Sequence, residues 1–163
     1  MHSSNDRRRR RQRIDRVLKE WAERAPEAPL PYERAPHLLS SGERALWYPL
    51  YRAVQGKYRI FCKVRLADVV RCPAANREEQ RWFRKIGRFH VDFVLCEPQT
   101  TAPLLVIELD DQSHHSKQRR ARDRFKDAVL GAARVPIYRV RAQQAYDPLE
   151  LAATVGRLIP AST

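Results

Sequence analysis

Residues 88–110, RFHVDFVLCEPQTTAPLLVIELD, contain two strongly apolar stretches that decide the fold. The first stretch, residues 88–96, is rich in β-branched and aromatic types, and the second, residues 104–110, is apolar on both faces until its acids begin. Stretches of this length and composition are typical of β-strands, and a strand without polar alternation is usually central and covered on both sides. The sequence therefore predicts two strands of a buried sheet.

The segment before these strands predicts a helix and a further strand. Ser40 followed by Glu43 is a capping-box pattern at the start of a helix that continues to about residue 55. Pro49 lies inside this helix and is expected to kink or break it. Residues 58–66 alternate in the manner of a strand, and residues 76–86 indicate a polar helix or an ordered loop.

The segment after the two strands predicts the rest of an α/β domain. It contains a long charged helix at 117–133, a strand at 137–142 and a last helix at 148–158. The three early strands are expected to pair as an antiparallel meander. The last strand follows a helical crossover and is expected to pair in parallel, which gives a mixed sheet with helices on both faces.

The N-terminal part of the chain differs in composition from this domain. Residues 1–13 carry six arginines and almost nothing apolar, so we expect them to be disordered when free. Residues 14–24 have apolar residues at helical spacing, which predicts a short amphipathic helix that, through Trp21, offers a docking site to a partner protein. A proline-rich linker follows. We expect an extension over residues 1–36 and a compact domain over 37–163.

The composition favours a polyanionic partner. Lys and Arg total 32 against 19 acidic residues, a formal net charge of +13, and basic side chains release counterions from nucleic acid on binding. Nucleic acid is therefore the expected partner, ahead of an anionic membrane surface. The three cysteines lack C-x-x-C spacing, and no apolar stretch approaches the roughly 18 residues of a membrane span. These features predict a cytoplasmic protein that does not enter a membrane.

Acidic residues stand in the two central strands. Glu108 and Asp110 point to one face of their strand, and Asp92 is expected to lie beside them if the two strands pair. Three neighbouring acids repel one another, and Mg²⁺ or Mn²⁺ bound by their oxygens removes the conflict. The competing interpretation is that the acids pair with arginines such as Arg88 or Arg139.

Basic residues and a histidine complete the candidate site. His114 follows the acids and is a candidate proton shuttle, metal ligand or phosphate contact. Basic side chains of the tail and of the 117–133 helix are candidate nucleic-acid contacts. They are Arg7, Arg8, Arg9, Arg10, Arg11, Lys117, Arg119, Arg120 and Lys126. The competing interpretation of the helix is a solvent face with weak ion pairs to Asp123 and Asp127.

The order of the motifs resembles an uncharacterised bacterial domain family. The motifs are S-x-x-E at 40–43, VRLADVV, HVDFVL, VIELDDQSHH and RDRFKDAVLGAARVPIYRV, and together they span about residues 37–155. This family is placed in the PD-(D/E)xK, or restriction-endonuclease-like, superfamily, near the very-short-patch-repair endonucleases. The resemblance implies an αβββαβ core and a Mg²⁺-dependent DNA endonuclease that hydrolyses phosphodiester bonds in DNA repair or defence.

The resemblance also implies roles for individual residues. Asp92 would be the first metal-binding acid, Glu108 the second, and Glu43 the helix acid, although the capping box with Ser40 explains Glu43 equally well. The superfamily's lysine, two residues after the second acid, is Asp110 here. Substitutes for this lysine are Lys63, Gln112 and His114. Two functions therefore stay open: a metal-dependent nuclease, or an inactive DNA-binding module that retains the nuclease fold.

Overall fold

The chain divides into two units, residues 1–36 and 37–163, in a computed structural model that describes residues 2–23, 30–73, 75–110 and 117–159. Each unit is described by itself. In the described part of the chain, no helix has the length and apolar character that crossing a membrane requires.

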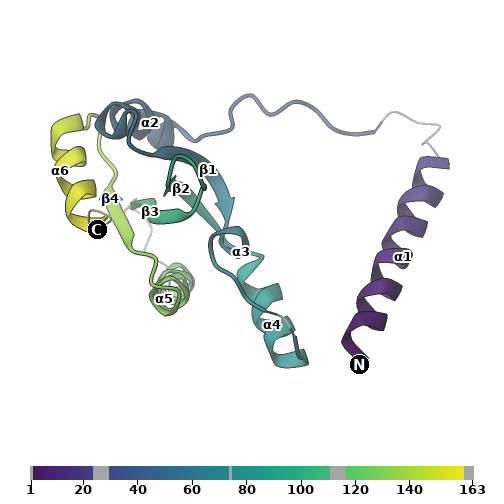
Figure 1. The fold of residues 1–163 in the computed structure, drawn as a ribbon. Helices are drawn as coiled ribbons and strands as arrows, with labels where there is room; N and C mark the ends of the chain where they lie inside the picture. The colour runs from purple at the N-terminus through teal and green to yellow at the C-terminus, as the bar shows by residue number, and fades with distance from the viewer. Residues whose placement is uncertain (1, 24–29, 74, 111–116, 160–163) are drawn as a thin grey trace. The chain divides into compact units, whose positions relative to one another are not determined.

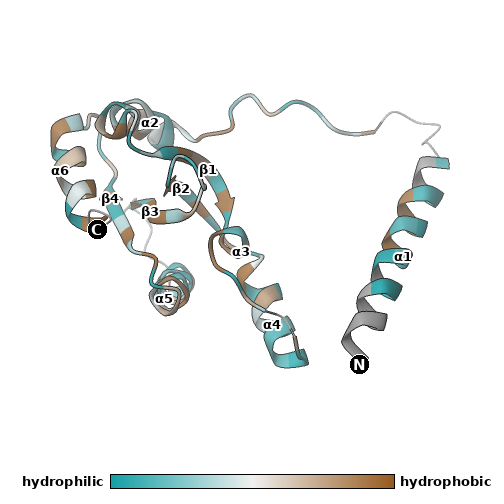
Figure 2. Cartoon of the chain, in the orientation of Figure 1, coloured by the Kyte–Doolittle hydropathy of each residue, from teal (hydrophilic) through white to brown (hydrophobic). Residues whose placement is uncertain are grey.

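The described residues of the N-terminal unit include one helix, α1 (His2–Glu23). The expectation of disorder over residues 1–13 is thus corrected: the helix runs through the arginines. Arginine is a good helix former, and ion pairs one turn apart join Arg16 to Glu20 at 3.7 Å and Lys19 to Glu23 at 3.8 Å. The helix is largely hydrophilic in Figure 2. The side chains of Arg7, Arg10 and Trp21 lie outside the described residues.

The larger unit is built on a four-stranded mixed sheet (Figure 1). Its strands, in the spatial order in which they pair, are β1 (Arg59–Arg65), β2 (His90–Cys96), β3 (Pro103–Asp110) and β4 (Ile137–Arg141). The first three pair antiparallel, and β4 pairs in parallel with β3. The meander and the parallel crossover predicted from the sequence are both confirmed.

Helices pack on both faces of this sheet. They are α2 (Ser41–Val54), α3 (Leu66–Val69), α4 (Arg77–Ile86), α5 (Lys117–Ala132) and α6 (Pro148–Leu158). Leu50 of α2 and Leu151 of α6 join one apolar cluster with Phe93 of β2. Leu130 of α5 joins a second cluster with Val106 of β3. The mixed α/β architecture is therefore confirmed.

Two local features that the sequence left open are the course of the chain at Pro49 and the structure of residues 77–86. The helix α2 continues past Pro49 to Val54, because the fully buried Leu46 and Leu50 hold it to the sheet and outweigh the cost of an interior proline, about 3 kcal/mol. Residues 77–86 form the helix α4, which resolves the choice between helix and ordered loop. The short helix α3 was not predicted.

Candidate functional site

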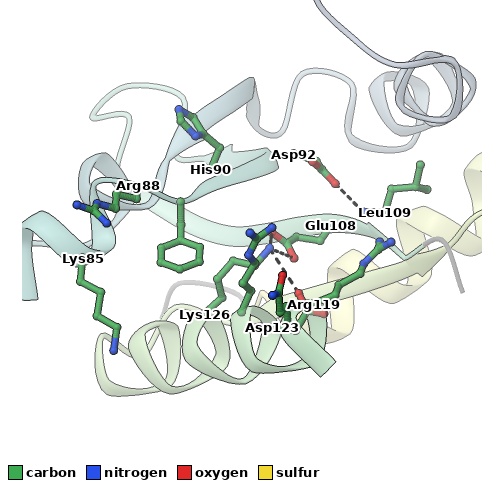
Figure 3. A pocket seen from close by; sticks show the side chains of 12 residues that line it. Lys85, Arg88, His90, Asp92, Glu108, Leu109, Arg119, Asp123 and Lys126 are labelled. Carbon is green, nitrogen blue, oxygen red and sulfur yellow. Dashed lines mark hydrogen bonds and ion pairs between the residues drawn. The ribbon is translucent and has the colours of Figure 1, made fainter. Parts of the chain in front are cut away.

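A hollow of about 890 Å³ lies between the sheet and α5, beside the two central strands (Figure 3). Asp92 of β2 and Glu108 of β3 line it together with Asp123 of α5. The basic side chains around it are Lys85, Arg88, Arg119, Arg122 and Lys126. The predicted pair of acids, Asp92 and Glu108, is thus brought to one hollow, and most of the charged groups around them are cations.

The carboxylate of Asp92 accepts a hydrogen bond from the backbone of β3, in place of a backbone carbonyl of β2. The paired residues of these strands end at Phe93 and Ile107. Beyond them, Oδ2 of Asp92 accepts a hydrogen bond from the backbone N–H of Leu109 at 2.9 Å (Figure 3). A buried N–H needs such a partner where a ladder ends. Asp92 is therefore fixed in position by the backbone of the neighbouring strand.

Glu43 of α2 caps its own helix and also pairs with a lysine of β1. Its Oε2 accepts the N–H of Ser40 at 2.7 Å, and Ser40 Oγ accepts the N–H of Glu43 at 3.3 Å, which completes the capping box. The other oxygen, Oε1, pairs with Lys63 of β1. Burial acts to raise the pKa of Glu43, but the bonds from Lys63, Ser40 and Asp92 outweigh it and bring the pKa to about 2. Glu43 is thus an ionised acid beside Asp92.

Asp92 holds its proton more tightly than an exposed aspartate does. Burial raises the pKa of Asp92, and the hydrogen bond to Glu43 and the negative charge of Glu108 raise it further. The N–H of Leu109 acts in the opposite direction, and the resulting pKa is about 6. Below that pH, Asp92 donates its proton to the Glu43 carboxylate, and above it the two carboxylates repel each other.

Glu108 is buried and is compensated by a lysine. Both of its oxygens contact Nζ of Lys126 in α5, with Oε2 at 2.6 Å, and the side chains of the pair are only 8% and 12% exposed. Arg139, one of the arginines considered as a partner of these acids, instead pairs with Asp127 at 2.7 Å. Glu108 is therefore held by an ammonium group at close range.

Asp110 does not join the two other acids. It lines a separate hollow of about 470 Å³ with arginines of α5 and β4, namely Arg120, Arg124 and Arg139. Among the residues that the structure describes, no three His, Cys, Asp or Glu side chains are grouped closely enough to hold one metal. Glu108 and Asp110 lie on the same face of β3, and residues two positions apart in a strand are separated by about 6.8 Å. Of the three acids expected to act together, Asp92 and Glu108 line the larger hollow and Asp110 lines the smaller one.

The predicted nucleic-acid contacts fall into two groups. Arg8, Arg9 and Arg11 are exposed on α1, and Lys117 is exposed at the start of α5. Arg119 lines the hollow with Asp92 and Glu108, whereas Arg120 lines the hollow with Asp110. His114 and Gln112 fall outside the described residues.

Lys126, a predicted nucleic-acid contact, pairs with Glu108 in the structure. It faces the sheet because it precedes the fully buried Leu130 by one helical turn, and this spacing was the available signal in the sequence. Sequence reasoning treated α5 as one basic surface and therefore missed the pairing of Lys126 with Glu108.

A profile of the family described as "Protein of unknown function (DUF2726)" matches residues 35–158. The chain belongs to the DUF2726 family. No curated protein and no solved structure matches the chain. The match covers every element of the DUF2726 domain from α2 to α6, and so includes Asp92 and Glu108.

Replacing Lys126 by methionine is expected to destabilise the DUF2726 domain by about 3 kcal/mol or more at neutral pH. The variant leaves Glu108 buried without its ammonium partner, and breaking one side of a buried pair costs more than removing both sides. The double variant Lys126→Met, Glu108→Gln should recover much of the loss. Urea unfolding of both variants measures the difference.

The matched control is Lys117→Met, which removes an exposed lysine from the same helix and should change the free energy of unfolding by less than about 0.5 kcal/mol. A Lys126→Met protein as stable as the Lys117→Met protein would contradict the buried ion pair.

Replacing Asp92 by asparagine is expected to stabilise the domain above about pH 7, by roughly 1–2 kcal/mol after solvent screening. The folded-state pKa of about 6 exceeds the unfolded value of 3.8, so the wild type loses stability as the pH rises from about 4 through 6. Asparagine can accept the Leu109 N–H and donate to Glu43, as protonated Asp92 does. Melting temperatures from pH 4 to pH 8 should show the gain growing with pH, and a gain independent of pH would refute this assignment.

Proposed function

We propose that the DUF2726 domain is a metal-dependent DNA nuclease of the restriction-endonuclease-like kind, in which Asp92 and Glu108 hold Mg²⁺ or Mn²⁺ for phosphodiester hydrolysis. The observation that carries this proposal is the charge arrangement of the hollow. Two acids on adjacent strands stand beneath a rim of cations that includes Arg88, Arg119 and Arg122. Acids suit a divalent cation and the rim suits phosphates, so the arrangement matches a phosphodiester bridged to a metal.

The donor set fits a hard divalent cation. Mg²⁺ is commonly bound by one or two carboxylates, with waters and substrate phosphates completing its shell. Burial and the neighbouring Glu43 and Glu108 carboxylates raise the pKa of Asp92, and a cation at this position would relieve that strain. When bound, the cation would supply Lewis-acid activation of water and charge stabilisation at the phosphate.

The chain's own residues would supply binding and positioning. The rim arginines would hold the phosphates on either side of the scissile bond. Lys126 lies beside the second acid, where it is suited to the role that the resemblance gives to the lysine replaced here by Asp110. Once Glu108 turns an oxygen toward a cation, the Lys126 ammonium can donate to the phosphate or to a water. Asp92 must lose its proton to act as a ligand, so metal affinity should fall below about pH 6.

The order of the elements also supports the proposal. Apart from the short α3 and α4, the domain runs α2, β1, β2, β3, α5 and β4 before its last helix. This is the αβββαβ order that the resemblance implies. It brings the two acids to the middle strands, with a helix before and after the meander.

The second candidate is a DNA-binding module without catalysis. The ion pair between Lys126 and Glu108 favours it, because this pair compensates the buried acid without any metal. The module would use the same cationic rim and the arginines of α1 to hold the DNA backbone.

Metal binding and cleavage distinguish the two candidates. Calorimetry with Mn²⁺ should show a site in the wild type that Asp92→Ala and Glu108→Gln each remove, since one remaining carboxylate competes poorly with water. Each variant should also lose at least about 100-fold in metal-dependent cleavage of supercoiled and single-stranded DNA. Asp110→Asn is the matched control and should retain both properties, because Asp110 lines the other hollow.

A wild-type protein that binds neither Mg²⁺ nor Mn²⁺ and cleaves no DNA would favour the binding module. Cleavage that survives in the protein with both Asp92→Ala and Glu108→Gln would come from a contaminating nuclease.

Deleting residues 1–13 should weaken DNA binding and flatten its salt dependence. The segment contains six arginines, and each phosphate contact contributes about 0.9 to the slope of log affinity against log salt concentration. The slope should therefore fall by up to about five. Fluorescence anisotropy over a salt series measures it, and an unchanged slope would mean that the segment does not touch the DNA.

A further inference from the structure

Basic and aromatic residues are interleaved on the helix α4. Its acids lie in the first turn, where Glu79 accepts the N–H of Ala75 at 2.6 Å and the side chain of Asn76 accepts the N–H of Glu79 at 2.9 Å. The rest of the helix and the turn after it present exposed cations. They are Arg77, Arg81, Arg84, Lys85 and Arg88.

Two large aromatic residues stand among these cations. The side chains of Trp82 and Phe83 are 48% and 43% exposed. Trp82 stacks on Phe125 of α5 with the ring centroids 6.5 Å apart and an angle of 10° between the planes, and Phe125 meets Phe89 at 5.1 Å. Lys85 lies over the rings of both Trp82 and Phe125. The stack anchors α4 to α5 through one face of Trp82, yet nearly half of the Trp82 surface remains open.

The same surface leads into the hollow that contains the acids. Lys85, Arg88 and Phe89 line that hollow together with Asp92 and Glu108. Figure 3 shows Lys85 and Arg88 at one side of it, with Asp92 and Glu108 farther along. A nucleic-acid strand that reached the acids along this side of the hollow would pass Lys85, whose ammonium lies over the Trp82 ring.

We propose that α4 is a stacking platform for single-stranded DNA, with Trp82 and Phe83 against unpaired bases and the exposed cations against phosphates. The faces of bases in a duplex are covered by their neighbours, whereas unpaired bases offer them to aromatic rings. Interleaved cations and exposed rings are the combination that binds single strands without regard to sequence. This inference rests on the proposed function and narrows its substrate class to DNA with an unpaired strand.

The test measures binding of the full chain without metal, so that it does not depend on cleavage. In EDTA, fluorescence anisotropy is recorded with a labelled oligo(dT) of about 16 nucleotides and with its duplex. Trp82→Leu and Phe83→Leu keep an apolar side chain but remove the ring. Tyr48→Leu is the matched control, because Tyr48 is an aromatic residue of α2 that is 63% exposed.

The wild type should bind the single strand more tightly than the duplex. Trp82→Leu should weaken single-strand binding by about 5- to 100-fold and change duplex binding by less than about twofold. Phe83→Leu should act in the same direction, and Tyr48→Leu should change neither affinity. The wild type and all three variants retain the α1 arginines, so the contribution of these arginines to affinity is the same in each comparison.

A second measurement guards against a variant that fails to fold. An oligonucleotide carrying 5-iodouracil, irradiated on the wild-type protein, should crosslink to the peptide that contains Trp82 and Phe83. Crosslinks confined to other segments would overturn the proposal, as would unchanged single-strand affinity in both folded variants. Ring-dependent binding without metal-dependent cleavage would uphold the platform and refute the nuclease. Metal-dependent cleavage of duplex DNA that Trp82→Leu leaves unchanged would uphold the nuclease and refute the platform.

Discussion

Three carboxyl groups held in and beside a small sheet constrain the DUF2726 domain. Charged groups inside a protein are costly unless each finds a partner. Glu43 has Lys63, Glu108 has Lys126, and Asp92 has the N–H of a neighbouring strand. These partners come from different elements, so the compensation of charge joins α2 to β1 and β3 to α5. The arrangement of strands and helices around the site follows from satisfying the three acids at once.

Stability alone does not account for these acids. A buried ion pair is often no more stabilising than apolar side chains of similar volume. The sheet around them is otherwise packed with residues such as Val94, Val106 and Ile107, and an apolar pair in place of Glu108 and Lys126 would continue that packing. Asp92 even acts against stability above its pKa of about 6. The presence of these acids, despite their cost to the stability of the fold, supports a functional site at this position.

Most of the fold could be predicted from the sequence because its signals are local. The apolar stretches predicted β2 and β3, and Ser40 with Glu43 predicted the start of α2. The helical crossover between β3 and β4 predicted their parallel pairing. The site was less predictable. Alternation along β3 assigns a face to Asp110, but it cannot say which hollow that face opens into. The pairing of Lys126 depends on how α5 is rotated against the sheet, and only its spacing from Leu130 indicated this. The helix through the N-terminal arginines was missed because charge density was weighted above helix propensity.

The positive groups beside Asp92 and Glu108 are those that the proposed metal would replace. Below about pH 6, a proton on Asp92 and the ammonium of Lys126 together supply two positive charges to the acids, the same charge as one divalent cation. A metal that replaced the proton and separated Lys126 from Glu108 would leave the charge of the buried layer unchanged. The ammonium released in this way would remain inside a hollow whose rim already attracts phosphates. Lys126 compensates Glu108 in the structure. If Asp92 and Glu108 held a metal, the Lys126 ammonium would be available to contact the substrate, and one lysine would then serve both the stability of the fold and the proposed reaction.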